Sequence, residues 1–131
     1  MESNKPVRVA VVGSREFDSY KLVENTVDSI LAERGLKDVL IVSGGARGVD
    51  TLAELYAIRR NLPKKVYKAN WTEYGKAAGP LRNTQIVENS DLIIAFRLPG
   101  SRGTQNTINQ AKERGVETIV IDVSVDHLKN Y

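Results

Sequence analysis

The sequence contains no cysteine and a single histidine, His127, near its C-terminal end. Without cysteine the chain can form no disulfide framework, no thiolate metal site and no cysteine nucleophile. With one histidine, histidine-rich metal sites and Ser–His or Cys–His triads are excluded as well. No carboxylate cluster has the spacing of metal ligands, so we expect no metal site and no required cofactor.

Long apolar runs are also missing. No segment approaches the roughly 20 apolar residues that a bilayer span needs, and no apolar core of a signal peptide follows residues 1–6. We therefore expect a cytoplasmic protein that makes no contact with a membrane, and the absence of cysteine is compatible with a reducing compartment.

Excess positive charge is small. Lys and Arg total 19 against 16 Asp and Glu, a formal net charge of +3, and aromatic residues make up 6%. Most nucleic-acid-binding modules carry a denser and more segregated positive charge. Nucleic acid is therefore the weaker of our partner expectations.

The 131 residues, 41% hydrophobic and 27% charged, are typical of one globular domain, and we expect a single domain over 1–131 with a core at about 7–123. Apolar runs predict strands at 7–12, 39–42, 65–69, 91–96 and 118–123. Helical spacing predicts helices at about 19–35, 49–60 and 104–114, and a short helix that begins at Pro80, after an irregular stretch at 70–79. The alternation predicts an α/β fold: a single-domain, Rossmann-like, doubly wound sheet, mainly parallel, of about five strands with helices on both faces.

The segments that follow the predicted strands are rich in glycine, hydroxyl side chains and arginine. In a doubly wound sheet, ligands bind outside the carboxyl ends of the strands, so these segments should meet at one rim. The residues that we predict to bind the ligand are Gly13, Ser14, Arg15, Ser43, Gly44, Gly45, Ala46, Arg47, Gly48, Asp50, Trp71, Arg82, Asn83, Pro99, Gly100, Ser101, Arg102, Gly103 and Thr104.

This composition favours a phosphate-containing small molecule. Three of the segments open directly into helices, whose N-termini attract anions. Glycine lets the backbone approach a phosphate closely, and arginine offers forked donors to its oxygens. A phosphate-binding loop of the ATPase type and a complete dinucleotide fingerprint are both absent, which disfavours ATP hydrolysis and a standard NAD dehydrogenase.

Each feature also has a purely structural interpretation. A Gly-Gly turn between a strand and a helix is often only a tight turn. Trp71 and Tyr74 either pack against the edge of the core or stack on a nucleobase. Asp50 either stabilises the dipole of its helix or binds a ribose hydroxyl, and Glu54 lies one turn further on the same face. His127 is expected to be an incidental surface residue.

Two turns carry a resemblance to a known family. Residues 13–15, Gly-Ser-Arg, and residues 43–50, Ser-Gly-Gly-Ala-Arg-Gly-Val-Asp, resemble the small stand-alone branch of the SLOG superfamily. This Rossmann-like group contains the Smf/DprA proteins and the LOG ("lonely guy") phosphoribohydrolases. Residues 78–83 and 103–104 continue the similarity, which covers about 7–123. The resemblance implies a site for nucleotides or nucleotide-derived ligands, and self-association into dimers or larger assemblies.

The chain departs from the LOG pattern at one position. The LOG signature is Pro-Gly-Gly-x-Gly-Thr-x-x-Glu, and residues 99–107 match it with Ser101 in place of the second glycine and Thr107 in place of the catalytic glutamate. Arg82 matches the LOG arginine, but Asn83 stands where LOG enzymes have lysine. Threonine cannot supply the carboxylate that stabilises oxocarbenium-like charge or activates water.

Three functions follow from these observations. The leading hypothesis is a sensor or sequestering module that binds a nucleotide or nucleotide derivative without catalysis. The alternative is a LOG-like phosphoribohydrolase or nucleotide N-glycosidase, whose catalytic residues are not assigned and whose candidates are Arg82 with Asp50, Glu54 or Glu73 as the acid. The third is DprA-like binding of single-stranded DNA.

Overall fold

The computed structural model describes residues 5–124, so His127 and the predicted tail lie outside the described residues. The elements in chain order are β1 (Val7–Gly13), α1 (Tyr20–Glu33), β2 (Val39–Ser43), α2 (Val49–Arg59), β3 (Lys64–Val66), α3 (Trp71–Tyr74), the 3-10 helix η1 (Gly75–Ala77), α4 (Ala78–Glu88), β4 (Leu92–Arg97), α5 (Arg102–Arg114) and β5 (Glu117–Asp122). Between residues 5 and 124, no helix combines the length and the apolar character needed to cross a membrane.

The strands form one parallel sheet in the order β3-β2-β1-β4-β5. Val9 of β1 pairs with Ile41 on one side and with Leu92 on the other. The chain builds the sheet outward from β1 through β2 and β3, and then crosses to the other side with β4 and β5. The predicted α/β fold is thus confirmed, and its topological switch point lies between β1 and β4.

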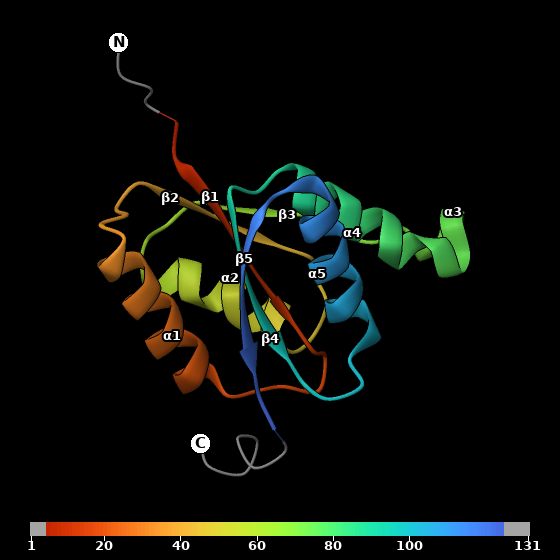
Figure 1. Ribbon diagram of the computed structural model, residues 1–131, viewed down its shortest axis with the longest axis horizontal. Coiled ribbons are helices and arrows are strands. Elements are labelled where there is room, and N and C mark those ends of the chain that lie inside the picture. The colour runs from red at the N-terminus through yellow and green to blue at the C-terminus, as the bar shows by residue number, and fades with distance from the viewer. Residues whose placement is uncertain (1–4, 125–131) are drawn as a thin grey trace.

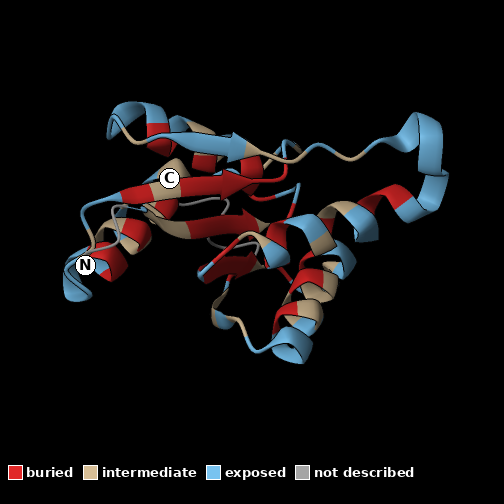
Figure 2. Ribbon diagram, turned by 90° about the horizontal axis from the view of Figure 1, so that it is seen from above, coloured by how far each residue is buried: buried red, intermediate tan, exposed pale blue. Residues whose placement is uncertain are grey.

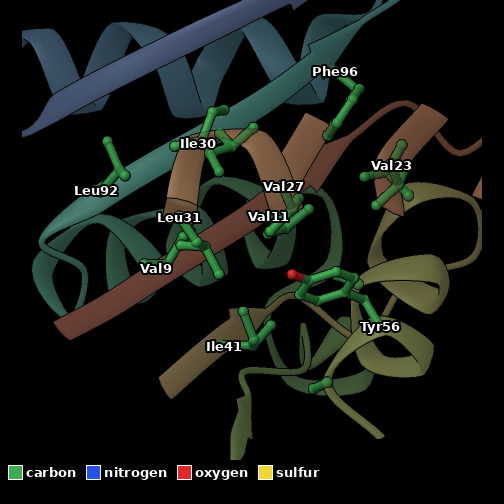
Figure 3. Packing of buried hydrophobic residues seen from close by; sticks show 14 of the residues in the cluster. Val9, Val11, Val23, Val27, Ile30, Leu31, Ile41, Tyr56, Leu92 and Phe96 are labelled. Atoms are coloured by element: carbon green, nitrogen blue, oxygen red, sulfur yellow. The ribbon is translucent and has the colours of Figure 1, made fainter. Parts of the chain in front are cut away.

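Alternate residues of the central strands supply two separate cores, because successive side chains of a strand point to opposite faces. Val9 and Val11 face α1 and α2, where they pack with Val27 and Tyr56 (Figure 3). Ala10, on the opposite face, belongs to a second cluster, to which α4 contributes Ile86 and Val87 and α5 contributes Ala111. Figure 1 shows the two helix pairs on opposite sides of the sheet.

The segment after β3 differs from the prediction. The strand spans Lys64–Val66 rather than 65–69, and helical turns replace the expected irregular stretch. The Asn70 Oδ1 accepts a hydrogen bond from the Glu73 N–H at 3.1 Å, and its Nδ2 donates to Glu73 Oε2 at 3.1 Å. This reciprocal capping starts α3. Pro80 is the third residue of α4 rather than the first, still within the first turn, where its missing N–H costs no helical bond.

Together α3 and η1 make an exposed arm. All of their residues are exposed, and Figures 1 and 2 show the arm standing out from the body of the molecule. The arm connects edge strand β3 to α4, and therefore begins at the same rim of the sheet at which the strands end.

Candidate functional site

A cavity of about 640 Å³ opens at the carboxyl ends of the strands, beside the switch point between β1 and β4. It lies between the β1–α1 loop, α4 and the β4–α5 loop. Most of the predicted ligand-binding residues line it, namely Gly13, Ser14, Arg15, Ala46, Asp50, Trp71, Arg82, Asn83, Pro99, Gly100, Ser101, Arg102, Gly103 and Thr104. Each of the segments predicted to meet at one rim therefore contributes at least one residue to this cavity.

A second hollow of about 520 Å³ adjoins the first. Arg15, Trp71 and Arg82 belong to the walls of both. Three further predicted residues line only the second hollow, namely Gly44, Gly45 and Arg47.

Two predicted residues line neither hollow and instead hold the β2–α2 turn. Ser43 is fully buried, and its Oγ lies 3.1 Å from both the backbone oxygen of Asp50 and Oε2 of Glu54. Gly48 has a φ of 76°, and a Cβ there would lie 2.6 Å from the Cα of Arg15. Glycine at 48 therefore allows the turn to press against the β1–α1 loop.

Asp50 and Arg82 face each other across Gly44. A Cβ on Gly44 would lie 2.6 Å from both Arg82 Nη1 and Asp50 Oδ2. The two side chains form no ion pair: Arg82 Nη1 donates to the Gly44 carbonyl at 2.5 Å, and Asp50 Oδ2 accepts the Ala46 N–H at 3.2 Å. A larger residue at 44 would displace both groups.

The Asp50 carboxyl is the one strongly perturbed acid of the cavity. Its residue is 5% exposed. Burial raises the pKa of Asp50 to about 6, although the positive charge of Arg82 opposes this rise. The same burial lowers the pKa of Arg82. Asp50 therefore changes its charge close to neutral pH, within a site that a ligand can reach.

The N-terminus of α5 forms another wall. Its first N–H groups have no partners within the helix, and the N-cap residue Ser101 does not cap them, because its Oγ instead donates to Thr104 Oγ1 at 2.8 Å. Asn83, on α4, donates its Nδ2 to Gly103 O at 3.3 Å and to Asn106 Oδ1 at 3.0 Å. This buried amide fixes α4 against the start of α5.

Arginines inside and outside the cavity differ in their partners. Five arginines away from it form ion pairs with carboxylates, namely Arg8–Asp91 at 3.0 Å, Arg34–Glu117 at 2.5 Å, Arg60–Asp28 at 2.6 Å, Arg97–Asp122 at 2.7 Å and Arg114–Glu88 at 3.8 Å. Arg59, also away from it, lies over the Tyr20 ring instead. Arg15, Arg82 and Arg102 line the cavity, and none of them forms an ion pair within residues 5–124. The acids that line the same cavity are Glu16 and Asp50, so its three arginines exceed its carboxylates by one.

The structure separates the candidate acids. Asp50 lines the cavity, whereas Glu54 lies against Ser43, and Glu73 is bonded to Asn70 on the exposed arm. Neither Glu54 nor Glu73 lines either hollow. No group of three or more acidic or histidine side chains in the described part of the chain is arranged to hold a metal ion.

The aromatic residues of the arm do not pack on the core. Trp71 is 50% exposed and Tyr74 is 49% exposed. The Trp71 ring lies in the wall shared by the two hollows, with the Arg15 guanidinium 5.6 Å from its centroid. Tyr74 lines neither hollow.

Four polar residues of the site are absent from the predicted ligand-binding set. Lys68 lines the second hollow, and Glu16, Asn106 and Thr107 line the first. Because the predicted strand ran to residue 69, Lys68 was placed inside it rather than beyond its end. Asn106 lies three residues after Gly103, and residues three apart share one face of a helix. This spacing could have identified Asn106 as a residue of the site.

Comparisons with known proteins agree with this architecture. The model of the YspA, cpYpsA-related SLOG family matches residues 7–74. The Gene 61 protein of Mycobacterium phage D29 is 33% identical over 118 residues, covering 86% of this chain and 94% of the phage protein.

Three solved structures have a similar fold. The single-stranded-DNA-binding DNA processing protein A (DprA) from Helicobacter pylori has a TM-score of 0.61 at 21% identity, over 89% of this chain and 66% of that one. DprA from Streptococcus pneumoniae has a TM-score of 0.55 at 20% identity, over 96% and 62%. The structural-genomics target TM1055 has a TM-score of 0.61 at 17% identity, over 86% and 72%. The chain thus spans less than two thirds of both DprA chains, and at these identities the similarity is one of fold.

Proposed function

Because the chain belongs to the YspA, cpYpsA-related SLOG family, we propose that it binds a nucleotide or nucleotide-derived, phosphate-containing ligand at the carboxyl edge of the sheet. It acts in this proposal as a sensor or sequestering module. The observation that carries the proposal is that Arg15, Arg82 and Arg102 meet in one cavity without an ion pair in the described chain, whereas five arginines away from it are paired.

Each wall of the cavity suits one part of such a ligand. A phosphate at the start of α5 accepts hydrogen bonds from the unpartnered N–H groups there and from Arg102. Asp50, when ionised, accepts a hydrogen bond from a ribose hydroxyl. The exposed ring of Trp71 offers a face on which a nucleobase stacks.

Thermal unfolding in phosphate-free buffer tests the proposal. A set of nucleoside mono-, di- and triphosphates and cyclic nucleotides is added, and a ligand present at about 100 times its Kd is expected to stabilise the fold by about 2.7 kcal/mol. Arg102→Ala removes one cation from the cavity. It should lower the affinity for the stabilising ligand about tenfold or more, because hydrogen bonds between charged groups are among the stronger ones.

Arg34→Ala is the matched control, since it removes the same charge from a position far from the cavity, where Arg34 pairs with Glu117. Equal losses of affinity in the two variants would mean that net charge, and not the cavity, attracts the ligand. If no phosphate compound raises the unfolding temperature, the proposal is wrong.

Hydrolysis of a nucleotide N-glycosidic bond is a second candidate function, favoured by one observation. Asp50 is a carboxyl that lines the cavity near the LOG-matching Arg82, and burial raises its pKa to about 6. In that case Asp50 activates water and Arg82 stabilises the phosphoribosyl group. Release of free base from nucleoside monophosphates, lost in Asp50→Asn, would establish this reaction.

Single-stranded DNA binding is the third candidate, and the similarity to the fold of the two DprA proteins supports it by analogy alone. A strand held through its phosphates loses affinity steeply as salt rises. Fluorescence anisotropy of a labelled oligonucleotide at several salt concentrations therefore tests this candidate directly.

Self-association is also proposed, because SLOG proteins commonly form dimers or larger assemblies. Sedimentation velocity measures the mass in solution, with and without the ligand found above. A monomer under both conditions would contradict it.

A further inference from the structure

The second hollow adjoins the main cavity without repeating it. The two share the walls made by Arg15, Trp71 and Arg82. The start of α5, including Arg102, lines only the first of them, and Lys68 lines only the second. Trp71 and Arg15 therefore stand between two ends of one extended site.

The second hollow has the charge of an anion site. Arg15, Arg47, Lys68 and Arg82 line it, and no carboxylate does. Lys68 forms no ion pair within the described part of the chain. Only Arg47 has an acidic partner, Glu16 at 3.3 Å, and both of these side chains are largely exposed.

The backbone of the β2–α2 turn brings Lys68 close. Gly45 has a φ of 71°, and a Cβ there would lie 3.0 Å from Cγ of Lys68. The lysine stem thus lies against the turn, and Lys68 lines a hollow to which no residue of α5 contributes. One phosphate group at the start of α5 leaves Arg15, Lys68 and Arg82 without an ion pair in the second hollow.

We infer that the ligand carries phosphate at both ends of a nucleoside, as in a nucleoside 3′,5′-bisphosphate or a phosphodiester-linked dinucleotide. One phosphate lies at Arg102 and the start of α5, the other at Lys68, and the base stacks at Trp71 between them. This inference rests on the proposed function and specifies the class of nucleotide.

The dimensions favour a small ligand over a long strand. Cavities of about 640 and 520 Å³ are each of the size that small-molecule sites have. A groove for single-stranded nucleic acid offers successive bases a series of aromatic platforms. This chain has one tryptophan, and Tyr74 on the same arm lines neither hollow.

Isothermal titration calorimetry in phosphate-free buffer tests the inference with four probes: adenosine 5′-monophosphate, adenosine 3′,5′-bisphosphate, the dinucleotide pApA and a 12-residue oligoadenylate. The bisphosphate and the dinucleotide are expected to bind about tenfold or more tightly than the monophosphate, because each adds a charge-assisted contact. Lys68→Ala should remove most of this advantage. Lys64→Ala, which changes the net charge equally from a position that lines neither hollow, should preserve it.

The outcomes separate the inference from the proposed function. If the monophosphate binds and the bisphosphate binds no more tightly, the inference is overturned while the proposed function stands. An equal affinity ratio in Lys68→Ala and wild type also overturns it. If the 12-residue strand binds more than tenfold better than pApA, the occupant is a nucleic-acid strand and the assignment of a small ligand is wrong. If no nucleotide of any kind binds, the proposed function itself fails.

Discussion

Replacing Asp50 with asparagine should stabilise the protein at neutral pH and have little effect in acid. The pKa of this buried carboxyl rises from its ordinary 3.8 to about 6 in the folded state. Folding therefore favours the protonated form, and ionisation above this pKa costs free energy. At about 1.4 kcal/mol per pKa unit, this difference corresponds to about 3 kcal/mol.

The sign of the effect follows from the order of the two pKa values. Because the folded pKa lies above the unfolded one, the folded state binds the proton more tightly, and this group's contribution to stability falls as pH rises from about 4 to about 6. Above that window the loss is complete. Asparagine does not ionise, and its side-chain oxygen can still accept the Ala46 N–H that Asp50 accepts.

Urea unfolding of both proteins at pH 4, 5, 6, 7 and 8 measures the effect. The difference in unfolding free energy between Asp50→Asn and wild type should widen by about 2.5 kcal/mol between pH 4 and pH 7 and then stay constant, because a small part of the effect is already present at pH 4. Comparison across pH cancels any constant effect of the amide on packing. A difference that is independent of pH would show that Arg82 offsets burial, and one that narrows as pH rises would show that Arg82 outweighs it. Either result would refute the predicted rise of the Asp50 pKa. Asp50→Asn should also bind the ligand more weakly, so that the same substitution raises stability and lowers affinity.

Three further predictions concern backbone, fluorescence and surface charge. Gly48→Ala should lower the unfolding free energy by more than about 2 kcal/mol, because a Cβ there would meet the β1–α1 loop. Gly35 has a similar positive φ but open space around it, so Gly35→Ala should lower the unfolding free energy by about 1 kcal/mol. Equal losses in urea unfolding would contradict the close approach at Gly48. The fluorescence of Trp71, the only tryptophan, should change on ligand binding, since it lines both hollows, and an unchanged emission spectrum at saturation would place the ligand elsewhere. Arg8→Ala should lower the unfolding free energy by about 1 kcal/mol at pH 7, a small loss because its ion-pair partner Asp91 is partly exposed. Arg8 lowers the pKa of Asp91, so this loss should vanish as pH falls through the lowered pKa. A loss that persists at pH 2 in urea titrations would count against the ion pair.

The fold and the rim were predictable because both depend on strong local patterns. Buried parallel strands need nearly continuous apolar runs, and Val9–Val12 and Leu92–Phe96 have them. Glycine and arginine after the strands fall at one edge in any doubly wound sheet, so Arg15 and Arg102 were placed together without knowledge of the strand order.

Other features depend on contacts between distant residues and could not be predicted. The residues next to Asp50 in the sequence do not indicate that Asp50 is only 5% exposed, because its burial comes from packing around the turn. The choice between Asp50 and Glu54 as the acid in the cavity likewise required the position of Ser43. The start of α3 did have a local signal: Asn70 and Glu73 stand three residues apart, the spacing of a capping box, but the flanking polar residues obscured it.

Strand β3 has a consequence for how copies of the chain meet. An unpaired sheet edge is a template on which a second polypeptide can add a strand, the starting point of aggregation. This edge has only three residues, and Lys64 and Lys65 are exposed on it. A copy that added here in antiparallel register would gain few backbone hydrogen bonds and would bring like charges together. The lysine-bearing edge therefore protects the sheet against uncontrolled growth from that side.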